Sequence, residues 1–135
     1  MNDAKILIAD DARVIRTVLT RKLEEAGYTV TAAENGQEVL EIIRREPFDL
    51  VILDLYMPGL DGLETTRAIR KIFSATHLPV IVATANNEEE HVLESFEAGA
   101  NDFVSKPINF PVLQARMATH LKLKRALEEL ERSRP

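Results

Sequence analysis

Several polar side chains directly follow short apolar runs, and together they could bind a metal ion and a phosphoryl group. They are Asp10 and Asp11 after KILIA, Asp54 after LVIL, Thr84 after VIVA, and Lys106 after DFVS. Alone, each would be an ordinary helix cap or loop residue, since Asp and Thr are common where a helix begins. Their repeated position predicts that three carboxylates, a hydroxyl and an ammonium group meet at one rim of a small sheet.

Carboxylates gathered at such a rim would repel one another. At an effective dielectric constant of about 20, two carboxylates about 4 Å apart cost roughly 4 kcal/mol, so the cluster should take up a proton or bind a cation. Oxygen ligands without His or Cys favour Mg²⁺ or Mn²⁺. A carboxylate that shares such an ion with a phosphoryl group can attack phosphorus. Asp54 would then become an acyl phosphate, with Lys106 supplying a cation and Thr84 a hydrogen-bond donor.

The apolar runs that position these residues predict strands, and three of them are almost continuously apolar, as in a parallel sheet covered on both faces. Strictly alternating strands and helices with short connections predict an α/β fold with a five-stranded doubly wound parallel sheet, whose strand order stays open. Such sheets bind ligands beyond the carboxyl ends of their strands. The predicted strands are Lys5–Ala9, Tyr28–Ala33, Asp49–Leu53, Pro79–Ala83 and Asp102–Ser105.

Helices are predicted between these strands from cap residues and apolar spacing. The first, about 11–26, carries one apolar stripe made of Val14, Ile15, Val18, Leu19 and Leu23. The others begin at Asn35 with Glu38 three residues later, at Asp61 with Glu64, after Asn86 and Asn87, and after Asn109 with Pro111 in the first turn.

The composition indicates one ordinary globular domain. The 135 residues include 17 Lys and Arg against 22 Asp and Glu, and the net charge of -5 disfavours binding to nucleic acid or anionic lipid. There is no Cys, which excludes disulfides and thiolate metal sites. No apolar run approaches the roughly 18 residues of a membrane span, so we expect a cytoplasmic protein with no membrane contact.

The residues at the rim resemble those of the receiver domain of two-component response regulators over about residues 4–122. The resemblance rests on the Asp10–Asp11 pair, on DLYMPGLDG at 54–62, on ATA at 83–85 and on FVSKP at 103–107, in family order and spacing. It implies a flavodoxin-like fold. It also implies a regulatory phosphoacceptor that assists its own phosphorylation and dephosphorylation and is not an enzyme acting on an outside substrate.

By this resemblance Asp54 is the phosphoacceptor in a Mg²⁺- or Mn²⁺-dependent reaction, and the phosphodonor is a sensor histidine kinase or phosphotransfer protein. Asp11 would bind the metal directly and Asp10 mainly through water, with the backbone carbonyl of Tyr56 completing the protein ligands. Lys106 would bind the phosphoryl group, and the Lys106–Pro107 peptide bond is expected to be cis.

The resemblance also implies a conformational switch. Thr84 would move toward the phosphoryl group while the ring of Phe103 turns inward, and the face made by the fourth helix, the last strand and the fifth helix would carry the output. Pro58, Gly59 and Gly62 would shape the loop after Asp54. Tyr56 and Asn86 occupy positions that tend to influence how fast water removes the phosphoryl group.

The fifth helix, from Pro111 to about Arg132, is longer than one sheet requires. Leu123, Leu127 and Leu130 are spaced as in the opening of a coiled coil. We therefore expect a receiver domain over residues 1–122 and a helical linker over 123–135 that leads to an output domain. A homodimer would form through the output face and this helix, and a single helix in solvent is the alternative.

Other functions fit the same residues less well. A stand-alone receiver could act as a protein-binding adapter, and a receiver that is never phosphorylated would not need the complete acidic set. A haloacid-dehalogenase-like phosphohydrolase normally has a second Asp where this chain has Tyr56. A flavin binder would need a hydroxyl- or glycine-rich loop in place of Asp10–Asp11. The histidines, His77, His91 and His120, have no metal-ligand spacing.

Overall fold

The structure is a computed structural model that describes residues 3–85 and 89–134. Strands and helices alternate along the described residues. In chain order they are β1 (Lys5–Ala9), α1 (Arg13–Glu25), β2 (Thr29–Ala33), α2 (Gly36–Arg45), β3 (Leu50–Asp54), α3 (Gly62–Arg70), β4 (Val80–Thr84), α4 (Glu89–Ala98), β5 (Asp102–Ser105) and α5 (Phe110–Arg132).

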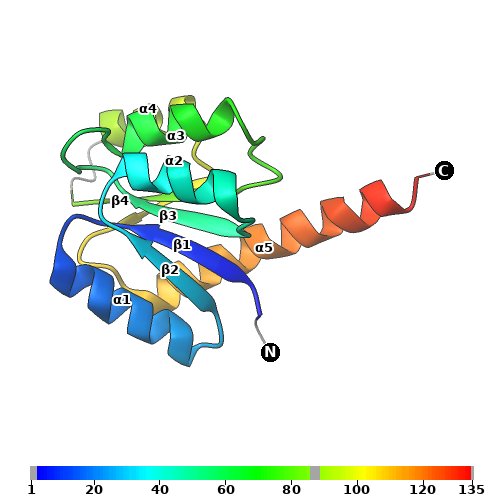
Figure 1. Cartoon of the computed structure of the whole chain (residues 1–135), viewed down its shortest axis with the longest axis horizontal. Helices are drawn as coiled ribbons and strands as arrows, with labels where there is room; N and C mark the ends of the chain where they lie inside the picture. The colour runs from blue at the N-terminus through cyan, green and yellow to red at the C-terminus, as the bar shows by residue number, and fades with distance from the viewer. Residues whose placement is uncertain (1–2, 86–88, 135) are drawn as a thin grey trace.

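The strands form one parallel sheet in the order β2-β1-β3-β4-β5, so the predicted doubly wound sheet is confirmed (Figure 1). The chain begins in β1, moves outward to β2, and then returns past β1 to β3. The order therefore reverses beside β1 and β3, and the carboxyl ends of those two strands border the crevice where such sheets bind ligands.

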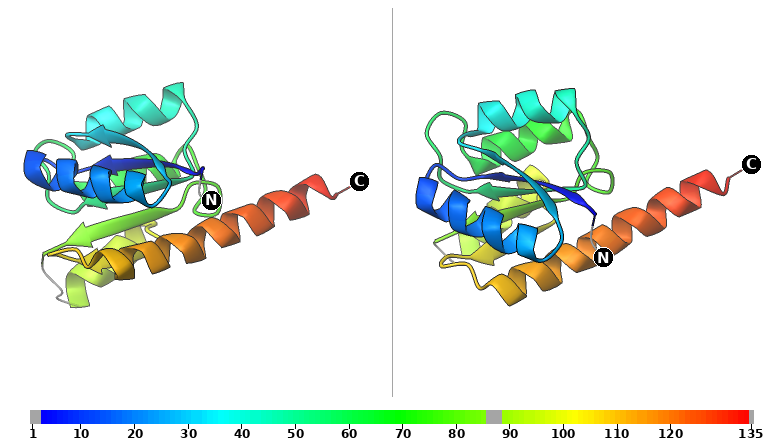
Figure 2. Two further views of the ribbon diagram at one scale, coloured as in Figure 1. Left: turned by 90° about the horizontal axis from the view of Figure 1, so that it is seen from below. Right: turned by 60° about the horizontal axis from the view of Figure 1, so that its bottom comes forward.

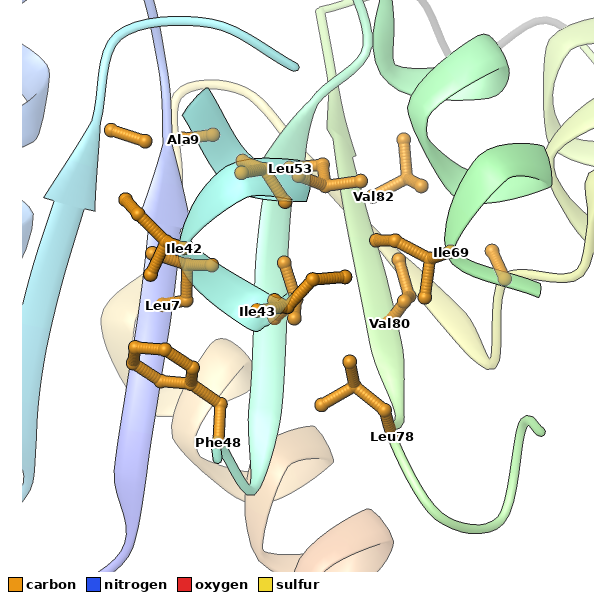
Figure 3. Close-up of a cluster of buried hydrophobic side chains, with 14 of the residues drawn as sticks. Leu7, Ala9, Ile42, Ile43, Phe48, Leu53, Ile69, Leu78, Val80 and Val82 are labelled. Atoms are coloured by element: carbon orange, nitrogen blue, oxygen red, sulfur yellow. The ribbon is translucent and has the colours of Figure 1, made fainter. Parts of the chain in front are cut away.

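Helices cover both faces of the sheet, with α1 and α5 on one face and α2, α3 and α4 on the other (Figure 1). The central strands β3 and β4 are buried along their whole length, which explains their continuous apolar sequences. Figure 3 shows how side chains of α2 and α3 pack on the sheet; its labelled members include Ile42, Ile43, Ile69, Leu53 and Val82.

The predicted apolar stripe of α1 is wrong in part. Leu19 and Leu23 are buried against the sheet, whereas Val14, Ile15 and Val18 are exposed. At about 100° per residue, Val18 lies about 100° and Val14 about 140° around the helix axis from Leu19, too far for one contact face. Ile15 lies in the first turn of the helix. An apolar surface is therefore left open on α1.

The predicted cap residues hold at three helices. Asn35 and Asn109 accept backbone N–H groups at the starts of α2 and α5, and Asp61 forms a complete capping box with Glu64 at α3. At α2 the box is incomplete, because Glu38 accepts from the N–H of Glu34 instead of Asn35. The predicted start of the fourth helix at Asn86 and Asn87 lies outside the described residues.

The last helix runs well past the sheet. Its first half is buried through Leu113, Met117 and Leu121, and its second half extends beyond the edge where the strands begin (Figure 2). In this second half Leu123 and Leu130 are exposed, but Lys124 is buried. None of the helices in the described part of the chain is long and apolar enough to cross a membrane.

Candidate functional site at the carboxyl edge

Three carboxylates meet at the carboxyl edge of the sheet. Ligand oxygens of Asp10, Asp11 and Asp54 all lie within 4.8 Å of one another. Asp10 and Asp54 are buried and Asp11 is exposed, so the cluster opens to solvent on one side. The Nζ atom of Lys106 lies 3.0 Å from Oδ2 of Asp10 and 3.0 Å from Oδ2 of Asp54.

The register of the parallel strands brings these residues together. Ala9 pairs with Leu53, so Asp10 and Asp54 follow neighbouring positions on β1 and β3. Thr84 pairs with Ser105, and the Lys106 N–H donates to the carbonyl of Thr84 at 2.8 Å. All five residues that sequence analysis selected therefore lie at this edge. The Lys106–Pro107 bond is cis in the structure.

Burial dominates the electrostatics of Asp54. It raises the pKa of the Asp54 carboxyl, and the neighbouring Asp10 charge raises it further, against the lowering effect of the hydrogen bond from Lys106. Burial also opposes the charge on Lys106, but its hydrogen bonds to Asp10 and Asp54 prevail and raise the pKa of that ammonium group. The pocket thus holds more negative charge than Lys106 alone neutralises.

The loop after β3 returns close to the strand that it leaves. The Gly62 N–H donates to the carbonyl of Leu55 at 2.8 Å, and a Cβ at Gly62 would lie 2.5 Å from the carbonyl oxygen of Asp54. A larger residue would therefore displace the end of β3. Gly59 has a φ of 78°, in the left-handed region that glycine adopts readily.

Arg16 on α1 supports the acidic loop, and sequence analysis missed it. Its Nη1 donates to the backbone carbonyl of Asp10 at 2.7 Å, while the Ala12 N–H donates to Oδ1 of Asp10 at 2.8 Å. These bonds fix the turn that presents Asp10 and Asp11. An arginine on a charged helix carries no signal in sequence that separates this role from an ordinary surface position.

The remaining predicted residues lie around the pocket. Thr84 is buried at the end of β4. Phe103 is half-buried on β5, between α4 and α5, and its ring contacts Phe96 and Arg116. Tyr56 is exposed, and its ring makes an edge-to-face contact with the ring of His91. Asn86 lies outside the described residues.

The other two histidines have ordinary partners. His120 Nε2 lies 3.0 Å from Asp102, and His77 Nε2 lies 3.3 Å from Glu131. The acidic site itself suits a hard divalent cation, because it offers carboxylate oxygens from two buried residues and one exposed residue.

Comparison with known proteins identifies the class. The family model of the response regulator receiver domain matches residues 6–118, and the chain belongs to this family, which is generally regulatory. As the family implies, it is a receiver domain of a two-component response regulator.

Individual relatives agree with this assignment. The chain is 38% identical over 117 residues to the transcriptional regulatory protein AfsQ1 of Streptomyces coelicolor, covering 87% of this chain and 51% of AfsQ1. It is 36% identical to a probable cyclic di-GMP phosphodiesterase of Vibrio cholerae, covering 96% of this chain and 29% of that protein. The solved Francisella response regulator 1452 receiver domain superposes with a TM-score of 0.82 at 32% identity, covering 89% of this chain and 98% of that domain. The chain spans about half or less of the length of these curated relatives.

Proposed function

We propose that Asp54 accepts a phosphoryl group from the phosphohistidine of a sensor histidine kinase or phosphotransfer protein. One Asp54 oxygen forms a bond to phosphorus, the P–N bond to the donor imidazole breaks, and the imidazole nitrogen takes up the electron pair. The observation that carries this proposal is the placement of Lys106 at 3.0 Å from both Asp10 and Asp54, at the rim where Asp11 also lies. The chain would promote its own phosphorylation and dephosphorylation and would turn over no outside substrate.

Mg²⁺ or Mn²⁺ would be held by Asp10, Asp11 and Asp54 and by the backbone carbonyl of Tyr56. When bound, the ion would offset the charge on the phosphoryl oxygens. Lys106 already lies 3.0 Å from Asp54, so its ammonium group would donate a hydrogen bond to a phosphoryl oxygen carried by that residue. The Thr84 hydroxyl would donate to another phosphoryl oxygen.

The open apolar surface of α1 supports a docked donor. Ile15 and Val18 line a hollow of about 160 Å³ that also includes Lys106, Pro107 and Phe110, so this surface reaches the rim of the pocket. A donor protein that covers this surface would bring its phosphohistidine to the side of the pocket where Lys106 lies.

The output would follow from a two-state switch. Phosphorylation adds oxygens that one arrangement of Thr84 and Lys106 satisfies best, and the Phe103 ring would turn inward in that arrangement. The proposed division is a receiver over residues 1–122 and a helical linker over 123–135. Exposed Leu123 and Leu130 support a homodimer through the linker and the face made by α4, β5 and α5.

We propose that the output is carried by a separate domain. An output domain beyond the linker is favoured over a stand-alone adapter, because α5 continues past the sheet and the relatives are longer than this chain. We propose no direct nucleic-acid or membrane contact for the receiver itself, and a cytoplasmic location. A phosphohydrolase of the haloacid dehalogenase type is not favoured, since membership of the receiver family and Tyr56 at the general-acid position both oppose it.

The phosphoacceptor is tested by incubating the chain with Mg²⁺ and acetyl phosphate and recording the intact mass. The parent should gain one phosphoryl group, Asp54→Ala should gain none, and EDTA should abolish the gain in the parent. Asp3→Ala, which removes an exposed carboxylate outside the pocket, is the matched control and should behave as the parent does. A phosphoryl group on Asp54→Ala would overturn the assignment.

The linker is tested by sedimentation with and without beryllofluoride, a phosphoryl analogue. The parent should associate on activation, and the double variant Leu123→Gln, Leu130→Gln should stay monomeric while still binding beryllofluoride. Association of both proteins to the same extent would count against the helical linker as a dimer contact.

A further inference from the structure

The ring of Phe103 lies between one side chain of α4 and one of α5. Its centroid is 6.3 Å from the centroid of the Phe96 ring, and the two planes meet at 88°, an edge-to-face arrangement. On the other side, Cζ of Arg116 lies 5.7 Å from the Phe103 centroid, within the range of a cation–π contact. Two specific partners therefore hold the ring in the position that the structure records.

Arg116 is itself held in place by Asp102. Its Nη1 donates to Oδ1 of Asp102 at 2.9 Å. The same carboxylate accepts the Phe103 N–H at 2.9 Å and contacts His120 at 3.0 Å. Nε of Arg116 is buried without a hydrogen-bond partner among the described residues, so Asp102 and the ring are the contacts that fix the guanidinium group.

Burial alone would not keep the ring here. Phe103 is only half-buried, and with Val112 and Arg116 it lines a hollow of about 240 Å³ at the surface. Phe96 and Val112 beside it are exposed. An inward move would remove more of the ring from water, so the outward position depends on contacts that are made only there.

We infer that Phe96 and Arg116 form a clamp that holds Phe103 outward in the resting receiver, which makes Arg116 a positioning residue for the switch. This inference rests on the proposed function, because it concerns the ring movement that phosphorylation would favour. The clamp stabilises one of two states. A ligand that binds only the state with the ring inward must first release the clamp. The smaller the fraction of molecules already in that state, the weaker the apparent affinity of the ligand.

The test measures the affinity of the Mg²⁺-loaded full chain for beryllofluoride by NMR titration. Arg116→Gln removes the cation but keeps a long polar side chain, and Phe96→Leu removes the ring but keeps an apolar residue. Lys122→Gln is the matched control, because it removes an exposed positive charge from the same helix. A cation–π contact at a partly exposed site is modest, so Arg116→Gln should bind about two- to fivefold more tightly than the parent.

The pattern across variants separates the clamp from a general effect on folding. The double variant should bind more tightly than either single one, Arg116→Lys should fall between the parent and Arg116→Gln, and Lys122→Gln should match the parent. A gain in affinity cannot come from a damaged fold. Unchanged or weaker binding by Arg116→Gln would overturn the clamp.

A second measurement needs no phosphoryl analogue. In the parent without ligand, nuclear Overhauser contacts should join the Phe103 ring to Phe96 and Arg116. In the Phe96→Leu, Arg116→Gln double variant, new contacts should join the Phe103 ring to the Thr84 methyl group. If the parent fails to bind beryllofluoride, the proposed function fails, and this measurement alone decides the clamp. A ring that contacts Thr84 equally in the parent and the double variant would refute it.

Discussion

At each end of the parallel strands a lysine lies between two carboxylates, and the carboxylates of the two clusters differ in their exposure to solvent. At the carboxyl edge Lys106 bridges Asp10 and Asp54, whose side chains are each 7% exposed. At the amino edge Lys124 on α5 bridges Asp49 and Glu128 at 3.2 and 3.0 Å, and these side chains are 38% and 41% exposed.

This difference in exposure explains why the amino-edge cluster stabilises the fold and the carboxyl-edge cluster can bind a ligand. Asp49 and Glu128 are partly exposed, so water also solvates their charges. Oδ2 of Asp49 accepts the Lys5 N–H at 2.8 Å, so this cluster attaches α5 to the sheet. At the carboxyl edge, one ammonium group faces two buried carboxylates and the nearby Asp11. That imbalance is partly relieved by a raised Asp54 pKa, and it leaves the pocket ready for a cation or a phosphoryl group.

Replacing each lysine by methionine should separate the clusters most clearly. Lys106→Met leaves two buried carboxylates without their cation, so the free energy of unfolding at pH 7 in EDTA should fall by about 3 kcal/mol. Lys124→Met keeps the apolar packing and leaves carboxylates that water can solvate, so the loss should be about 1 kcal/mol. Urea unfolding measures both, and equal losses would refute the contrast.

Replacing an aspartate by asparagine at each edge should change stability in opposite directions. Because the folded-state pKa of Asp54 is raised, its charged form is disfavoured in the fold, and Asp54→Asn should stabilise the metal-free chain at pH 7 by about 1 kcal/mol. Asp49→Asn weakens the Lys124 ion pair and should destabilise the chain by about 1 kcal/mol.

The pH dependence follows from the same shift. The cost of the Asp54 charge is fully present above its folded-state pKa and disappears as the pH falls through that value to the unfolded-state pKa. The gain from Asp54→Asn should therefore shrink in acid. A gain that stays constant from pH 7 to pH 3 would mean that the Asp54 charge is not its cause.

The residues of the carboxyl edge could be predicted from the sequence, whereas the cluster at the amino edge could not. Asp10, Asp54, Thr84 and Lys106 each follow an apolar run, and in a parallel sheet this position alone brings them to one rim. Lys124 continues the buried face of α5 at helical spacing from Met117 and Leu121, but a lysine at that position does not by itself indicate which carboxylates it contacts. One of its two partners, Asp49, comes from a distant part of the sequence, so only the folded chain brings it to Lys124.

The order of the strands and the detailed contacts of the site could not be predicted from the sequence either. Alternation of strands and helices is a local pattern, whereas the position of β2 outside β1 depends on which face each helix covers. The clamp around Phe103 consists of Phe96 on α4 and Arg116 on α5, and Asp102 on β5 holds Arg116, so only packing places these residues together. The predicted apolar stripe of α1 is wider than its contact face, because only Leu19 and Leu23 of the five predicted residues are buried.

Magnesium should stabilise the fold only through the carboxylates of the carboxyl edge. At a concentration ten times the dissociation constant, a ligand that binds only the folded chain adds about 1.4 kcal/mol to stability. We expect this gain in the parent and in Asp49→Asn, and most of it should be lost in Asp11→Asn. Calorimetric unfolding with and without Mg²⁺ gives the comparison. A full gain in Asp11→Asn would exclude Asp11 as a ligand.

The smallest effect should come from the outermost contact of the amino edge. His77 lies 3.3 Å from Glu131, but both side chains are about half exposed, at 48% and 45%. His77→Gln should therefore change the free energy of unfolding by less than about 0.5 kcal/mol at pH 7, since exposed ion pairs are weak. Because Lys124 is buried and fixes the same part of α5, it should outweigh His77 in holding the helix. A loss in His77→Gln as large as that in Lys124→Met would show instead that the end of α5 depends on its exposed contact.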